Sequence, residues 1–234
     1  MNLEDYQRKE QARLEVAARH LENGVEIVDI HSVYIDPSVE IEPGAFIGPC
    51  VTLEGNTHIG AGSRIMQNSR IVDSEIGDNV LVQSSVILES TVGNGTNVGP
   101  FAYMRPHSHV GENCKIGDFV EIKNSTFGDG SKSAHLTYIG DADVGKDVNL
   151  GCGIVFVNYD GNEKHRTTVG DGAFIGCNTN LISPVNVGDG AYIAAGSTLT
   201  EDVPENALGI ARERQTNIEG WAERRGLYRR NKKK

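Results

Sequence analysis

Three side chains that could act together on a charged substrate lie close to one another in the middle of the sequence. Lys123, His135 and Tyr138 each stand at a polar position next to an apolar residue. A lysine is a cation, a histidine can accept a proton near neutral pH, and a tyrosine supplies a phenol. On one short segment these groups suggest chemistry on an anionic substrate.

A six-residue repeat must position these groups. Apolar residues, called anchors below, recur every six residues from Ile35 to Ile71 and continue, after one-residue slips, as far as Leu199. Glycine follows many anchors directly. A small or β-branched residue stands four positions after most of them, and examples are Ala45, Thr57, Ser63, Thr96, Ala102, Cys114, Thr126, Ala173, Thr179, Ala191 and Ser197.

This pattern predicts an all-β fold, a parallel β-helix with a narrow triangular core filled by anchors and small residues. Three hexapeptides form one eighteen-residue coil, so the repeat holds about nine coils, roughly 43 Å at the spacing of neighbouring strands. Arg105 and Lys123 each follow an anchor and are eighteen residues apart. We therefore expect them to face outward on successive coils. Two stacked cations favour a bound phosphate between them, and the alternative is two solvated surface charges.

The repeat is interrupted between Leu150 and Val169. The sequence Asn-Tyr-Asp-Gly at 158–161 is a turn signal, and three basic residues follow at 164–166. An interrupted solenoid usually carries a loop on its binding face, although a neutral surface insertion is the alternative.

The two ends of the chain differ from the repeat. Apolar residues at helical spacing before Asn23-Gly24 predict an amphipathic helix that covers the open end of the solenoid or links it to an upstream domain. The domain boundaries predicted are a linker helix at 1–24, the β-helix at 25–203, and a C-terminal arm with a basic tail at 204–234. Trp221 is expected to pack on another coil or another subunit.

Composition excludes several classes of function. Residues 212–234 contain nine basic residues and three glutamates, which gives this segment a net charge of +6. Because the whole chain has a net charge of −10, residues 1–211 carry a net charge of −16. The acidic body argues against nucleic-acid binding. No apolar stretch is long enough to span a membrane, and the N-terminus is not a signal peptide. Four cysteines without metal-ligand spacing predict no metal and a reduced, cytoplasmic setting.

Five strings carry a resemblance to a known family: GPFAYMRP at 99–106, FVEIKNS at 119–125, SAHLTYIGDA at 133–142, FVNYDG at 156–161 and YIAAGS at 192–197. They resemble the acetyltransferase domain of the bifunctional N-acetylglucosamine-1-phosphate uridylyltransferase/glucosamine-1-phosphate N-acetyltransferase family. Residues 23–99 resemble its linker and early coils more loosely. The resemblance implies a left-handed β-helix and a homotrimer with sites shared between chains. It also implies that the uridylyltransferase half is missing, in a stand-alone enzyme or in a shortened piece of a longer chain.

The resemblance further implies a reaction and the residues that perform it. Acetyl-CoA would acetylate the amine of glucosamine 1-phosphate, giving N-acetylglucosamine 1-phosphate for UDP-N-acetylglucosamine and cell-wall precursor synthesis. Sugar-phosphate contacts fall on Arg105, Lys123, Tyr138 and Asn149, and the proton acceptor falls on His135. Acetyl-CoA contacts fall on Cys152, Asn158, Tyr159, Lys164, Cys177, Ala195 and Arg212. Other members often have Ala at position 152 and Ser at 177, which are also small.

Some assignments and alternatives remain open at this stage. Glu121 could orient His135, and the oxyanion could be supported by Asn158 or by a backbone N–H. A cysteine nucleophile is less expected, because Cys152, Cys177 and Ala195 share one turn position that suits a flat edge for CoA. A zinc enzyme based on the histidines at 107 and 109 lacks a third histidine at coil spacing. A non-catalytic assembly module, or an acyltransferase for a different amino-sugar phosphate, is also possible.

Overall fold

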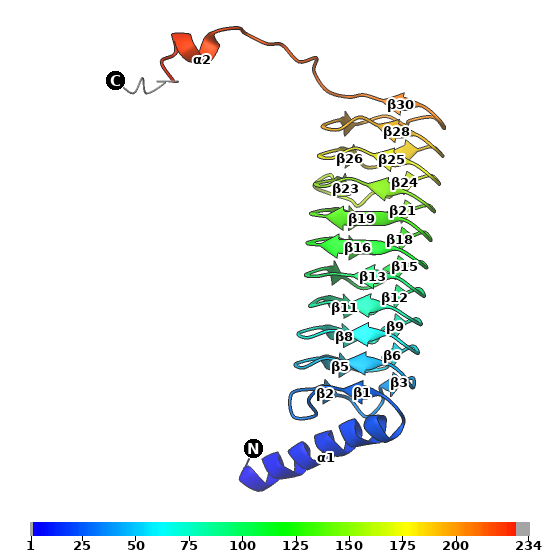
Figure 1. Ribbon diagram of the computed structural model, residues 1–234. Helices are drawn as coiled ribbons and strands as arrows, with labels where there is room; N and C mark the ends of the chain where they lie inside the picture. The colour runs from blue at the N-terminus through cyan, green and yellow to red at the C-terminus, as the bar shows by residue number, and fades with distance from the viewer. Residues whose placement is uncertain (1, 228–234) are drawn as a thin grey trace.

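The repeat folds into three parallel sheets whose short strands stack coil upon coil (Figure 1). The computed structural model describes residues 2–227, and within them it confirms the left-handed parallel β-helix that the sequence predicts. Sheet A consists of β1 (Glu26–Ile27), β4 (Phe46–Ile47), β7 (Arg64–Ile65), β10 (Leu81–Val82), β13 (Asn97–Val98), β16 (Lys115–Asp118), β19 (Lys132–His135), β22 (Asn149–Leu150), β25 (Phe174–Ile175), β28 (Tyr192–Ile193) and β30 (Leu208–Gly209).

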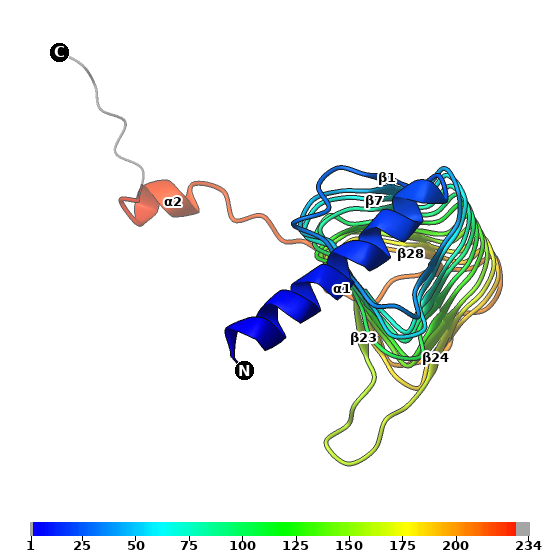
Figure 2. The same cartoon turned by 90° about the horizontal axis from the view of Figure 1, so that it is seen from below.

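The other two sheets complete the triangular cross-section seen in Figure 2. Sheet B consists of β2 (Tyr34–Ile35), β5 (Thr52–Glu54), β8 (Arg70–Val72), β11 (Val86–Leu88), β14 (Tyr103–Met104), β17 (Glu121–Lys123), β20 (Tyr138–Gly140), β23 (Val155–Val157), β26 (Asn180–Ile182) and β29 (Thr198–Leu199). Sheet C consists of β3 (Glu40–Ile41), β6 (His58–Ile59), β9 (Glu75–Ile76), β12 (Thr91–Val92), β15 (His109–Val110), β18 (Thr126–Phe127), β21 (Ala142–Val144), β24 (Thr167–Val169) and β27 (Asn186–Val187).

The predicted anchors form the core. Every anchor from Ile35 to Leu199 is buried, and the side chains stack in register from coil to coil, as Ile71, Ile87 and Met104 do in sheet B. Burying these apolar side chains supplies the main driving force for folding, at about 25 cal/mol per Å² removed from water. Sheets A, B and C contain eleven, ten and nine strands, so the described solenoid is slightly longer than the nine coils expected.

Repeats that are one residue short explain one error in the predicted core. Thr126 is exposed, where its hydroxyl donates to Asp143 at 2.7 Å, and the buried residue is Ser125 instead. The anchors Ile122 and Phe127 are only five positions apart, so the inward small residue comes three positions after Ile122. The Ser125 hydroxyl donates to the carbonyl of Lys123 at 2.8 Å, so this backbone acceptor in the tightened turn has a hydrogen-bond partner.

Helix α1 (Leu3–Glu22) lies across the base of the solenoid, as predicted (Figure 1). The Asn2 side chain caps its first turn by accepting from the Asp5 N–H at 2.8 Å. Arg13 ties the helix to the first coil by donating to the carbonyl of Ile30 at 2.9 Å and to that of Val33 at 2.5 Å. Neither α1 nor α2 (Trp221–Arg224), the helices of the described residues, is long and apolar enough to cross a membrane.

The solenoid ends later than predicted, because β30 (Leu208–Gly209) pairs with β28 beyond residue 203. The arm then leaves the body and carries α2 away from the coils (Figures 1 and 2). Trp221 is 45% exposed on α2, which lies away from the coils in Figures 1 and 2; the Arg225 guanidinium lies 5.5 Å from its ring. The basic residues predicted for the tail at 229–234 lie outside the described residues.

Candidate active site

One column of residues runs up the corner between sheets A and B, and we call it the edge column. Its members are Asp118, His135, Cys152, Cys177 and Ala195, each two residues past a buried residue of sheet A. Those buried residues pair coil to coil, so the column members lie in register. The shared turn position expected for the two cysteines and Ala195 is therefore present, and it extends down to His135.

Arg212 lies at the upper end of the edge column. Its Cδ atom is 3.6 Å from the position that a Cβ on Gly196 would occupy, so the side chain lies beside the coil of Ala195. Four of the seven residues predicted to contact acetyl-CoA, namely Cys152, Cys177, Ala195 and Arg212, thus share one edge of the molecule.

At the lower end of the column, His135 is held by an aspartate from the coil below. Its Nδ1 lies 2.7 Å from Oδ1 of Asp118, and the hydrogen bond from His135 lowers the pKa of the Asp118 carboxyl. If Nδ1 donates to the carboxylate, Nε2 is left with its lone pair and can accept a proton. The expectation that Glu121 orients His135 is wrong, because Glu121 accepts from Arg105 at 2.9 Å on sheet B instead.

Sheet B carries the predicted cations on its outer face. The pairing of Met104 with Ile122 confirms that Arg105 and Lys123 occupy successive coils. Each cation has a carboxylate of this chain as partner: Arg105 binds Glu121, and Lys123 lies 3.0 Å from Asp141 Oδ2. The inference that an outside anion must separate the two cations therefore does not hold.

Asp141 is the centre of a buried polar network. It is 6% exposed and accepts from Lys123, from Asn124 at 2.5 Å and from the Asn158 side chain. Burial acts to raise the pKa of Asp141, but the hydrogen bonds from Asn124, Lys123 and Asn158 outweigh it, so the pKa is lowered. The Asn158 amide nitrogen is therefore committed to structure, which leaves a backbone N–H as the better candidate for oxyanion support.

The interruption predicted in the repeat is a loop at 158–166 between β23 and β24, which projects beyond the triangular body (Figure 2). We call it the excursion. Asn158 holds one stem through Asp141, and Arg166 holds the other by donating to both oxygens of Asp143 at 2.5 and 2.6 Å. At the predicted turn, Asp160 accepts from two backbone N–H groups and faces His165, and these contacts strongly lower its pKa.

The excursion brings Lys164 to the cations of sheet B. The neighbouring Lys123 lowers the pKa of the Lys164 ammonium, so these two charges lie close together. The phenol of Tyr138 folds over Gly140, where a Cβ would lie 2.4 Å from the Tyr138 hydroxyl oxygen, and Gly140 pairs in register with Lys123. Arg105, Lys123, Tyr138 and Lys164 therefore form one group, called the face-B cluster below. Lys164 was expected among the acetyl-CoA contacts.

Two predicted residues stand apart from both groups within this chain. Asn149 lies on sheet A, between Lys132 and Phe174 of the neighbouring coils. Tyr159 is 56% exposed on the excursion, and its hydroxyl donates to the carbonyl of Gly161. A single chain therefore does not bring all the predicted site residues together.

Sequence reasoning missed two aspartates of the site, Asp118 and Asp141. The register itself was the available signal: the coil from Asp118 to His135 is seventeen residues long, one short of the standard coil. Asp141 directly follows Gly140, which pairs with Lys123, so the same seventeen-residue register was needed to place it.

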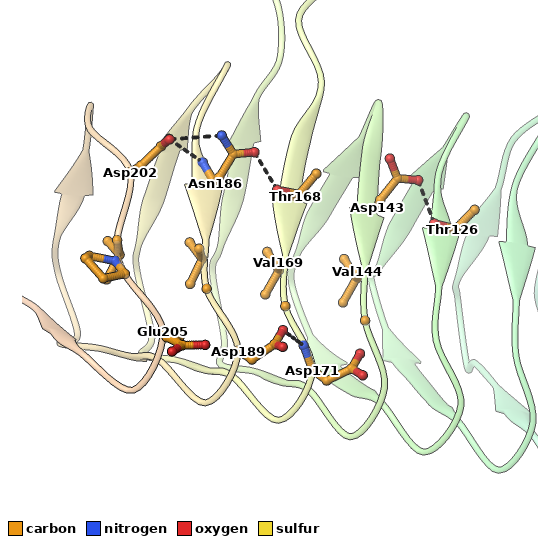
Figure 3. Close-up of a pocket in the computed structure, with 16 residues that line it drawn as sticks. Thr126, Asp143, Val144, Thr168, Val169, Asp171, Asn186, Asp189, Asp202 and Glu205 are labelled. Carbon is orange, nitrogen blue, oxygen red and sulfur yellow. Dashed lines mark hydrogen bonds between the residues drawn. The ribbon is translucent and has the colours of Figure 1, made fainter.

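A groove on sheet C holds another set of polar side chains (Figure 3). They are largely paired with one another: Asp202 accepts from the Asn186 backbone at 2.7 Å, and Thr168 donates to Asn186 at 2.6 Å. Across the described residues no three His, Cys, Asp or Glu side chains gather as metal ligands. His109, one of the histidines considered for zinc, lies 3.0 Å from the Thr91 hydroxyl.

Comparison with known proteins finds similar sequences for several parts of the chain. Residues 89–124 and 166–201 match the bacterial transferase hexapeptide (six repeats), and residues 30–94 match the GMPPB C-terminal domain. Both stretches of the transferase match fall on coils of the β-helix. Two similar curated relatives are both described as "Bifunctional protein GlmU". The one from Clostridium beijerinckii is 56% identical over 89% of this chain and 46% of its own length. The one from Acetivibrio thermocellus is 56% identical over 94% of this chain and 48% of its own.

This hexapeptide-repeat chain thus spans about half the length of the curated relatives it matches. Among solved structures, an Arabidopsis UDP-N-acetylglucosamine acyltransferase is similar with a TM-score of 0.52 and 18% identity. The match covers 84% of this chain and 76% of that one. At that identity the likeness supports the fold alone.

Proposed function

We propose that this chain transfers an acetyl group from acetyl-CoA to the amine of glucosamine 1-phosphate, with His135 as the general base. One observation carries the proposal. His135 stands in a column of small side chains suited to an extended thioester, and a cluster of cations suited to a phosphate lies across the adjoining sheet B. Relatives described as bifunctional GlmU proteins, 56% identical over most of this chain, support the same reaction.

The face-B cluster would bind the acceptor. Arg105, Lys123 and Lys164 carry three positive charges against the two carboxylates of Glu121 and Asp141, so one positive charge remains uncompensated. A phosphate would relieve the repulsion between the two lysines and accept hydrogen bonds from all three cations. The Tyr138 phenol, held over Gly140, would contact the sugar.

The edge column would bind the donor. The pantetheine arm of acetyl-CoA would lie along Cys152, Cys177 and Ala195, and Arg212 would meet a phosphate at the far end. The amine nitrogen attacks the thioester carbonyl, and Nε2 of His135 takes the proton that the nitrogen loses. Collapse of the tetrahedral intermediate breaks the carbon–sulfur bond and releases CoA.

The complete site would be shared between copies of the chain. His135 lies at the A–B corner, the face-B cluster and excursion lie toward the B–C corner, and Asn149 lies on sheet A. A rigid solenoid cannot fold these faces together, so neighbouring chains would supply the missing side chains. We propose a homotrimer in which the edge column of one chain faces the excursion of the next.

A thiol-release assay with acetyl-CoA tests the reaction. Glucosamine 1-phosphate should release CoA, whereas glucosamine lacks the phosphate and N-acetylglucosamine 1-phosphate lacks the free amine, so both should be poor acceptors. Replacing His135 with Ala should lower kcat by about 10²- to 10⁴-fold. His107→Ala, at an exposed histidine on the B–C corner, is the matched control and should retain activity. Near-normal turnover of H135A at pH 7 would remove His135 from its role.

A further inference from the structure

Cys152 and Cys177 occupy the same position on successive coils. Each lies two residues past a buried residue of sheet A, and those residues, Leu150 and Ile175, are paired in register. Contact between the coils continues through the turn, because the Asn178 N–H donates to the carbonyl of Cys152 at 2.8 Å. Neighbouring strands lie about 4.7–4.9 Å apart, and disulfides join Cα atoms about 4.4–6.8 Å apart.

The direction of the Cys177 side chain brings its sulfur toward the coil below. Its Sγ lies 3.0 Å from the position that a Cβ on Gly151 would take, next to Cys152 in the chain. Cys177 is exposed and Cys152 is half-buried, so a small reagent in solution can reach the pair.

The other two cysteines lack such a neighbour. Cys50 is exposed, but the Ser32 hydroxyl accepts from its N–H on the coil below, and Asn68 takes the next place above. Cys114 is buried in the core, and burial raises the pKa of its thiol. The four cysteines therefore comprise one adjacent pair and two isolated thiols.

We propose that Cys152 and Cys177 form a vicinal thiol pair that a low-molecular-weight disulfide oxidises to an intrachain disulfide. The Cys177 thiolate attacks one sulfur of the reagent, forming a mixed disulfide and releasing the first reagent thiolate. The Cys152 thiolate then attacks Sγ of Cys177, closing the protein disulfide and releasing the second. The two protein thiols lose two protons and two electrons, and the reagent is reduced to two thiols.

The test exposes the folded full chain to oxidised glutathione, then unfolds it in the presence of iodoacetamide to block the remaining thiols, and measures intact mass and linked peptides. We expect a peptide linking residues 152 and 177, with neither of these two cysteines blocked. In a Cys50→Ser chain, which has no second exposed thiol to take up glutathione, the mass should fall by two hydrogens before blocking. Cys152→Ser should stop at a glutathione adduct on Cys177. Cys50→Ser should still form the link. Four free thiols, a lasting adduct on Cys177 beside a free Cys152, or links between chains would each overturn the proposal.

The consequence for catalysis rests on the proposed function, since the pair lies on the edge proposed for acetyl-CoA. The oxidised chain should lose acetyl transfer, and dithiothreitol should restore it. The thiol count and linked peptide need no enzymatic activity. If the link forms in a chain that never transfers acetyl groups, the proposed function fails and the thiol pair stands.

Discussion

At the residue scale, the hydrogen bond between Asp118 and His135 determines how the proposed base can work. The carboxylate holds one ring nitrogen and leaves the other to receive a proton. Because both side chains are partly exposed, at 38% and 56%, the pair is a weaker version of the buried Asp–His pairs of hydrolases. Asp118 would act through His135, as a positioning residue.

Replacing Asp118 with Asn should lower kcat by roughly 10- to 100-fold, less than the ~10⁴-fold loss at a buried triad aspartate. The KM values for both substrates and the melting temperature should change little, because neither the cations nor the core is altered. Steady-state kinetics and thermal unfolding measure these quantities. Glu121→Gln removes a carboxylate that pairs with Arg105 and leaves the Asp118–His135 pair intact, so it is the matched control and should leave kcat unchanged. A purely structural role for Asp118 would lower the melting temperature and leave kcat intact.

The lowered pKa of Asp141 makes a stability prediction with a defined pH range. A carboxyl whose folded-state pKa is depressed contributes fully above its ordinary value of 3.8 and loses that contribution as the pH falls through the lowered pKa. Asp141→Asn leaves the largely buried Lys123 without its counter-charge, and we expect a loss of about 3 kcal/mol in the free energy of unfolding.

Urea unfolding should therefore give a difference in the free energy of unfolding between D141N and the unchanged chain that is constant from pH 5 to pH 8. This difference should shrink below about pH 3.8. Asp147→Asn is the matched control. Asp147, with a φ of 54°, shares the positive φ of Asp141, which is 50°, but its side chain is exposed. A difference that grows as the solution is acidified would contradict the assignment.

At the scale of elements, the sequence predicted the coils well because one physical requirement repeats. An inward apolar residue every six positions can only be buried by stacking coils, and every predicted anchor is buried. The errors come from five-residue repeats, where a serine can fill the inward slot one position early. Because Ser125 fills the inward slot, the prediction that Thr126 is buried was wrong. The same short repeat makes this coil seventeen residues long, so counting eighteen residues back from His135 does not reach Asp118.

Side-chain pairing was less predictable than the coils. Whether Asp118 or Glu121 bonds to His135 depends on which residue of the coil below pairs with His135 in the strand register. A register shift of one residue would change that partner. The position of Lys164 depends on how the excursion folds back, which no repeat determines. The family resemblance supplied residue identities but no contacts within this chain.

The excursion is clamped at its C-terminal stem by Arg166, and this clamp can be tested. Arg166→Gln removes two hydrogen bonds to Asp143 and the bonds to the carbonyls of Asn124 and Ala142. The side chains of the ion pair are about 40% exposed, so we expect a loss of only about 1 kcal/mol in stability. Release of the stem should nevertheless speed tryptic cleavage after Lys164 and raise the KM for glucosamine 1-phosphate.

Arg70→Gln is the matched control, since it removes a comparable surface pair with Glu54 on an earlier coil. That variant should lose a similar small amount of stability without any change in cleavage at Lys164. Equal cleavage rates in the two variants would mean that the Asn158 stem alone holds the excursion.

At the scale of the whole molecule, the described chain is a rod with a detached arm. The last coils end in β30, and the arm beyond exposes Ile218, Trp221 and Leu227 at 62%, 45% and 66%. Large apolar side chains exposed along one short segment favour contact with another surface. In the proposed trimer that surface belongs to a neighbouring chain, and Trp221, the only tryptophan, reports the contact.

Light scattering and tryptophan emission, followed together over a dilution series, test this arrangement. At high concentration the mass should be three times that of the chain and the emission blue-shifted, because the indole is covered. On dilution the mass, the blue shift and the rate of acetyl transfer should decline together. A chain ending at Arg212 keeps the edge column, yet it should dissociate at a higher concentration than the full chain. A fully active monomer whose emission does not depend on concentration would contradict both the arm contact and the shared site.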